Sequence, residues 1–144
     1  MVAEIGVLHV EAQPVAVARG TARWDNIPPV VIGLMNLAVH HGEGLQVAIY
    51  YPRPEGPMIE AGVLVPTAFK DHDSVFCSAT PAGLAAVTSY TGPYRGIPPV
   101  HCAIQNWAKE HGHTLAGPNW EIYAHWDEDE TKLRTDIYYL LKDE

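Results

Sequence analysis

The residues with the clearest chemical potential lie in segment 118–126, Pro-Asn-Trp-Glu-Ile-Tyr-Ala-His-Trp. Aromatic and apolar residues alternate with polar ones here, which is the period of a β-strand. Successive side chains of a strand point to opposite faces. One face, expected in the core, carries Trp120, Ile122, Ala124 and Trp126. The other face carries Glu121, Tyr123 and His125. A carboxylate on a half-buried strand is costly without a partner, so we predict that a ligand supplies that partner.

The composition limits the classes of function that this chain can serve. Its 144 residues suit one compact domain, and 17 acidic against nine basic residues give a formal charge of −8. That charge argues against direct nucleic-acid binding, which needs a basic face, and is compatible with attracting cations. The first residues lack a basic, apolar signal sequence, and no apolar run reaches the ~20 residues of a membrane span. We therefore expect a cytoplasmic protein with no membrane contact.

Strand and helix patterns alternate along the chain in an order that occurs twice. Helices are predicted where Ile-Pro-Pro-Val begins a segment, because proline is tolerated in the first helical turn. These helices cover residues 29–41 and 97–112, each ending near a glycine. Strands are predicted at 2–10, 15–22, 46–51, 60–65, 75–78, 84–91, 120–126 and 134–141.

The two halves of the chain also share sequence. When residues 15–45 are moved forward by 70, twelve of 31 positions are identical, where chance gives about two. We infer an internal repeat, about 1–66 and 71–144, within a single domain of residues 1–144. The predicted fold is α+β, with two strand-strand-helix-strand-strand modules related by a pseudo-twofold axis. An antiparallel sheet would carry the helices on one face and a ligand groove on the other, at the seam of the modules.

The repeat also indicates where the halves differ. Continued with the same offset, it places Glu121 on Tyr51 and Trp120 on Tyr50. One half would then present a carboxylate where the other presents a phenol, which suits an asymmetric small molecule.

Four sequence motifs resemble the GyrI-like small-molecule-binding family, the effector-binding domains of AraC-type and multidrug-sensing transcription regulators and their stand-alone relatives. The motifs are Tyr90-Thr91-Gly92-Pro93-Tyr94, the helix with Asn106-Trp107 that ends at His111-Gly112, Trp120-Glu121-Ile122-Tyr123, and 133–138, Leu-Arg-Thr-Asp-Ile-Tyr. Together they span about sixty residues in the family's order.

This resemblance implies a ligand site in which Glu121 faces a bound cation and aromatic rings surround it. Tyr94, Tyr123 and Tyr138 are candidate ligand-binding residues by motif position. Tyr51 and Trp24 are candidates only through the internal repeat. The chain has no room or basic segment for a DNA-binding domain, so it resembles the stand-alone branch.

Three functions remain open from the sequence. The first is a stand-alone protein that binds bulky apolar or cationic aromatic molecules, with Glu121 as anchor. The second, implied by the resemblance, is a hydrolase that opens cyclopropane rings of DNA-alkylating natural products with Glu121 and Tyr123. The third is a protein-interaction module of the gyrase-inhibitor kind. We expect no cofactor and no metal, since the metal-site spacings of His and Cys are missing. A monomer and a homodimer are both compatible with the sequence.

Overall fold

The structure, a computed structural model, describes residues 2–142. The first half of the chain forms β1 (Gly6–Val10), β2 (Pro14–Thr21), α1 (Ile27–Ala38), β3 (Gln46–Tyr51) and β4 (Met58–Leu64). The second half forms β5 (Phe76–Ala79), β6 (Gly83–Thr91), α2 (Ile97–Glu110), β7 (Leu115–Tyr123) and β8 (Arg134–Leu141). Short 3₁₀ helices lie at Val39–His41, Tyr94–Gly96 and Glu130–Lys132. The predicted α+β class and the alternation of strands and helices are confirmed.

All eight strands form one open antiparallel sheet in the order β1-β6-β8-β7-β3-β4-β2-β5. The central pair, β3 and β7, joins the two halves. The edge strands are exchanged between the halves, because β1 pairs with β6 and β5 pairs with β2. The segments that follow β1 and β5, residues 11–13 and 80–82, therefore cross the sheet next to each other; we call them the two crossing segments. Gln13 and Thr80 join them, with 2.9 Å from the Gln13 backbone N to Thr80 Oγ1.

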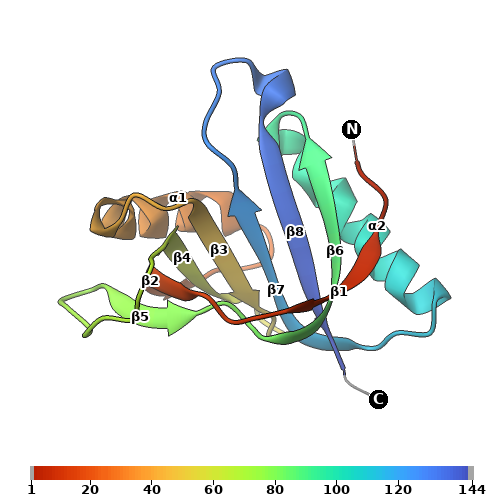
Figure 1. Cartoon of the computed structure of the whole chain (residues 1–144), viewed down its shortest axis with the longest axis horizontal. Helices are drawn as coiled ribbons and strands as arrows, with labels where there is room; N and C mark the ends of the chain where they lie inside the picture. The colour runs from red at the N-terminus through yellow and green to blue at the C-terminus, as the bar shows by residue number, and fades with distance from the viewer. Residues whose placement is uncertain (1, 143–144) are drawn as a thin grey trace.

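Both helices pack on the same face of the sheet, at either side of the central strands (Figure 1). Small residues on this face allow the close approach: Ala16 and Ala18 of β2 meet α1, and Ala86 of β6 meets α2. The helices contribute equivalent alanines, Ala38 and Ala108, which are both fully buried.

Larger side chains form a separate core on the face that carries no helix, which we call the helix-free face. Its buried members are Val15, Val17, Val47, Ile49, Ala85 and Trp120. Trp120 is therefore a core residue, as the alternation predicted, but its core lies opposite the helices.

Two expectations about β7 were wrong. The strand ends at Tyr123 rather than at residue 126, and Trp126 is 72% exposed instead of buried. The cause is the long connection to β8: after the Ala124 backbone N–H bonds the Arg134 carbonyl oxygen, the chain leaves the sheet.

The offset of 70 residues also fails within β7, although it holds for the preceding strand and helix. The register between β7 and β8 shifts between Leu115 and Asn119, and Gly117 has a φ of +123° there. A bulge of this kind adds residues to one strand and can reverse which face a following side chain points to. Tyr51 therefore points to the helix-free face, while Glu121 points to the helix face.

Candidate functional site

Glu121 lies at the centre of the sheet, where the two halves meet. Its cross-strand neighbours are Ala48 on β3, which packs against α1, and Ile137 on β8, which packs against α2. The residue is 5% exposed. The strand alternation thus places a carboxylate on the helix face, in the gap between the two helix-packed clusters.

Three side chains hold the Glu121 carboxylate. Tyr50 on β3 donates its hydroxyl to Oε1 over 3.3 Å, and Tyr123 donates to the same oxygen. On the other oxygen, Oε2, His101 Nε2 of α2 lies at 2.5 Å. Both halves of the chain therefore contribute to one buried acidic group.

His101 belongs to a longer chain of hydrogen bonds on the face of α2 that covers the sheet. Its Nδ1 lies 2.6 Å from Tyr139 Oη on β8, and Gln105 Nε2 donates to that same hydroxyl oxygen over 3.2 Å. Because Tyr139 accepts from Gln105, its own proton is available for His101 Nδ1. His101 thus places Nδ1 at Tyr139 and Nε2 at Glu121, so each of these groups has a partner.

The tyrosines of this network remain protonated at neutral pH. Burial, and then the neighbouring Glu121 charge, raise the pKa of both Tyr50 and Tyr123 well above the ordinary value. Burial likewise raises the pKa of Tyr139. Tyr50 and Tyr123 therefore donate hydrogen bonds to Glu121 but cannot neutralise its charge.

A second buried glutamate, Glu60, has its negative charge paired with a cation inside the protein. Glu60, 3% exposed, lies on the helix-free face and accepts from Arg19 Nε at 2.6 Å. It also accepts from Tyr51 Oη at 3.2 Å and from Ser78 Oγ at 2.7 Å. Glu60 has a permanent cation beside it, whereas the described partners of Glu121 include no lysine or arginine. Among the described residues, Glu121 is therefore the buried carboxylate that has an imidazole, and no lysine or arginine, beside it.

A cavity of about 300 Å³ lies beside this network. Its walls are the segment before β3, the end of β7 and the turn before α2: Gly44, Leu45, Gln46, Tyr94, Tyr123, Ala124, His125 and Trp126. Tyr94 meets the Tyr123 ring edge to face, with ring centroids 5.7 Å apart. The ring of Tyr123 thus lines the cavity, and its hydroxyl bonds Glu121. In this structure Tyr123 therefore lies between the cavity and the Glu121 carboxylate.

The structure brings together three of the six predicted ligand-binding residues, namely Glu121, Tyr123 and Tyr94. Tyr138 lies on the helix-free face, where its ring stacks on Trp120 at 5.0 Å. Tyr51 is on that face too, bonded to Glu60. Trp24 is 55% exposed in the turn before α1, and its indole nitrogen donates to the Pro54 carbonyl oxygen over 3.1 Å. The repeat led to Tyr51 rather than Tyr50 because the offset of 70 no longer holds in β7 after the register shift between Leu115 and Asn119.

His101 is the main residue that sequence reasoning missed. The signal was present in the helix periodicity. Ile97, His101, Ile104 and Ala108 are spaced by four, three and four residues, which places them on one helical face. A histidine on an otherwise apolar stripe, at the position where the first half has Val31, indicates a polar partner on the sheet.

Two further features of residues 2–142 bear on function. No group of three or more His, Cys, Asp or Glu side chains there could hold a metal ion. None of the described helices has the length and apolarity needed to cross a membrane.

Comparison with known proteins identifies the fold. The model of the GyrI-like small molecule binding domain matches residues 3–142. The C-terminal domain of EcmrR superposes with a TM-score of 0.71 at 16% identity, covering 97% of this chain and 98% of that one. In a complex of EcmrR with DNA, the matching region is 57% of the EcmrR chain. No curated protein sequence matches this chain.

Two other solved structures share the fold at low identity. SAV2435 bound to tetraphenylphosphonium has a TM-score of 0.68 at 12% identity, with coverage of 97% of this chain and 94% of SAV2435. A hydrolase from Listeria innocua has a TM-score of 0.64 at 10% identity, with coverage of 96% and 92%. At these identities, the likeness concerns the fold.

Proposed function

Because this chain belongs to the GyrI-like small-molecule-binding family, we propose that it binds bulky apolar or cationic aromatic molecules with Glu121 as the charge anchor. The observation that carries the proposal is a carboxylate, 5% exposed, whose described partners include no lysine or arginine. A ligand cation would supply a permanent positive charge, in addition to the His101 contact. The tetraphenylphosphonium bound to SAV2435 is a ligand of the same chemical class.

The cavity lined by Tyr94, Tyr123 and Trp126 is the proposed binding site for such a ligand. Tyr94 and Tyr123 offer ring faces and edges, and Trp126 stands exposed at the same cavity. A cation over an aromatic ring gains about 0.5–2 kcal/mol, more when water is excluded. The cavity volume of about 300 Å³ is at the lower end of ligand sites. We therefore propose that Tyr123 turns away from Glu121 when a bulky cation enters.

A titration with tetraphenylphosphonium, followed by tryptophan fluorescence, tests the anchor. Glu121→Gln keeps the shape and removes the charge, and we expect it to weaken binding tenfold or more, because ~1.4 kcal/mol is tenfold. Glu60→Gln is the matched control: it removes one buried charge from the opposite face and should leave the affinity within about twofold. Equal affinity for wild type and Glu121→Gln would remove Glu121 from the site.

A hydrolase that opens cyclopropane rings is the second candidate, and the hydrogen-bonded His101, Glu121 and Tyr123 favour it. A carboxylate backed by an imidazole can accept a proton from water as the water oxygen bonds a cyclopropane carbon and a ring C–C bond breaks. The electron pair of that bond passes to a conjugated carbonyl oxygen of the substrate, to which Tyr123, kept protonated by its raised pKa, can donate a hydrogen bond. The test is incubation with a cyclopropane-bearing alkylator. Ring-opened product above the buffer rate, lost in Glu121→Gln and reduced in Tyr123→Phe, would support catalysis. A wild-type rate equal to buffer would exclude it.

A further inference from the structure

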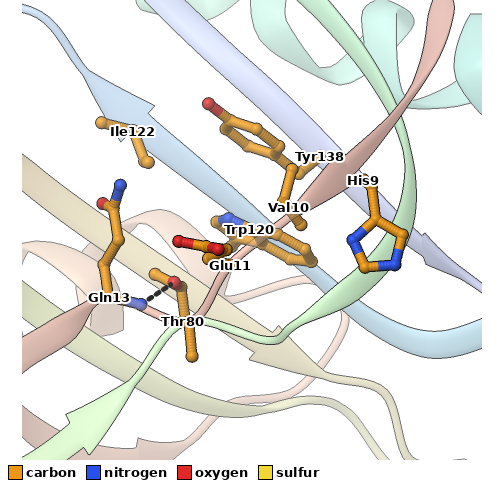
Figure 2. A pocket seen from close by; sticks show the side chains of 9 residues that line it. His9, Val10, Glu11, Gln13, Thr80, Trp120, Ile122 and Tyr138 are labelled. Carbon is orange, nitrogen blue, oxygen red and sulfur yellow. Dashed lines mark hydrogen bonds between the residues drawn. The ribbon is translucent and has the colours of Figure 1, made fainter.

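We propose a second ligand site on the helix-free face, which binds small aromatic molecules that carry one ammonium group. The site is a cavity of about 500 Å³ bounded by the two crossing segments and the floor of the sheet (Figure 2). Its lining comes from β1 and the segment after it, from Thr80, and from β7 and β8. This volume lies within the usual range of small-molecule sites.

Aromatic rings form the floor of this cavity. Trp120 and Tyr138 are directly opposite each other on β7 and β8, and their rings are parallel within 2°. Val10 and Ile122 add apolar walls. A ligand ring can therefore lie against aromatic and aliphatic surface without meeting a charged group of the sheet.

Two polar groups at the cavity, the Trp120 indole N–H and the Glu11 carboxylate, have no partner among the described residues, whereas Gln13 and Thr80 bond each other. Trp120 is 2% exposed, yet its indole N–H forms no hydrogen bond with a described residue. In Figure 2 the indole nitrogen lies on the side of the ring where the Glu11 carboxylate is also drawn. The nitrogen itself is not a fully buried atom, so it is open to the cavity, where water or a ligand can accept its hydrogen bond.

The charge of the lining selects the class of ligand. Glu11 is the carboxylate in the lining of this cavity, and the lining includes no lysine or arginine. The side chain of Glu11 forms no ion pair with another described residue. An ammonium group at Glu11, with its ring on Tyr138, which stacks on the buried Trp120, satisfies both the charge and the aromatic surface. The whole chain, at −8, favours a cation over an anion.

This site is separate from the one at Glu121, because Trp120 and Glu121 are consecutive residues of one strand and point to opposite faces. The exchanged edge strands create it, since Glu11 and Gln13 follow β1 while Thr80 follows β5. Its existence does not depend on ligand binding at Glu121.

The experiment uses 2-phenylethylammonium as the probe and the four tryptophan indole N–H resonances of the ¹⁵N-labelled protein as reporters. Trp120→Phe assigns the resonance of Trp120. We expect saturable movement of that resonance, about threefold weaker binding in Glu11→Gln, as for an exposed ion pair, and affinity within twofold of wild type in Glu121→Gln. Phenylacetate, with the same ring and the opposite charge, should not bind.

Three results would overturn the proposal. The first is a Trp120 resonance that does not move in a saturable way. The second is equal binding of phenylacetate, which would remove the role of Glu11. The third is loss of the response in Glu121→Gln together with a normal response in Glu11→Gln, which would place the probe on the helix face.

Discussion

Tyr50 and Tyr51 are neighbours in β3 that serve different carboxylates on opposite faces. Tyr50 donates to Glu121 and Tyr51 donates to Glu60. Each hydroxyl can be removed by a change to Phe with little effect on packing. The pair therefore separates the effect of losing a hydrogen bond from the effect of changing the ligand site.

We predict that Tyr50→Phe and Tyr51→Phe each lower the free energy of unfolding by about 1 kcal/mol, the usual net value of one hydrogen bond. Their effects on tetraphenylphosphonium should differ. Tyr50→Phe takes a donor away from Glu121, so the carboxylate gains more from a cation and the affinity should rise by up to about fivefold. Tyr51→Phe should leave the affinity unchanged. Identical binding by both variants would contradict the arrangement at Glu121.

His101 is predicted to hold Glu121 and Tyr139 in position rather than to contact the ligand. His101→Phe removes the imidazole that bonds Glu121 Oε2 and the Tyr139 hydroxyl, at a cost of about 1–3 kcal/mol for each group, while the bonds from Tyr50, Tyr123 and Gln105 remain. We expect a lower free energy of unfolding in urea denaturation. Gln105→Ala serves as the control, because it removes only the 3.2 Å bond to Tyr139 at an exposed residue. Its effect should be smaller than 1 kcal/mol. A His101→Phe protein as stable as wild type would contradict the network.

At the scale of elements, the bulge in β7 decides which face Glu121 occupies. Gly117 has a φ of +123°, which side-chain-bearing residues rarely adopt, and a Cβ there meets no other atom within 4 Å. Gly117→Ala therefore tests backbone strain alone. We predict a loss of about 1–3 kcal/mol in unfolding free energy. Weaker tetraphenylphosphonium binding should accompany it if the strand relaxes by shifting register.

Gly33 is the matched control, because it lies exposed in the middle of α1 with open space around it. Alanine is favoured over glycine at such a position by up to about 1 kcal/mol, so Gly33→Ala should stabilise the protein. Thermal unfolding of both variants checks this. Stabilisation by both changes would mean that the bulge does not constrain β7.

The sequence predicted elements better than it predicted their pairing. Strands at 46–51 and 134–141 were predicted with the bounds observed, because alternating apolar residues and turn residues determine them locally. The exchange of β1 and β5 could not be predicted, since both edge strands would fit either half equally well. The face of Glu121 was also unpredictable from the repeat, because one bulge changes it. Tyr94 and Tyr123 were predicted to lie near Glu121, but Tyr50 and His101 were not.

At the scale of the whole molecule, raised tyrosine pKa values link folding to alkaline pH. Burial and then the Glu60 charge raise the pKa of Tyr51 to about 12 from an ordinary 10.0. A pKa that is higher in the folded state stabilises the protein fully below pH 10, and this contribution is lost as the pH rises towards 12. Tyr50, Tyr123 and Tyr139 add to the same trend.

We therefore predict that the free energy of unfolding falls as the pH rises from about 9 to 11, measured by urea denaturation at each pH. Tyr51→Phe should make this fall shallower, because one linked group is removed. Phenolate absorbance should also appear at higher pH in the folded protein than in the urea-unfolded chain. A stability that stays constant over this range would contradict the burial of these phenols.

We propose that a cation binds at Glu121, on the helix face, where the two halves of the chain join. A crystal structure of the complex with tetraphenylphosphonium would show this binding site directly. We expect the phosphonium in the cavity of Tyr94 and Trp126, with Tyr123 turned away and the Glu121 carboxylate facing the ligand. A phosphonium bound only on the helix-free face, with Tyr123 still bonded to Glu121, would contradict it.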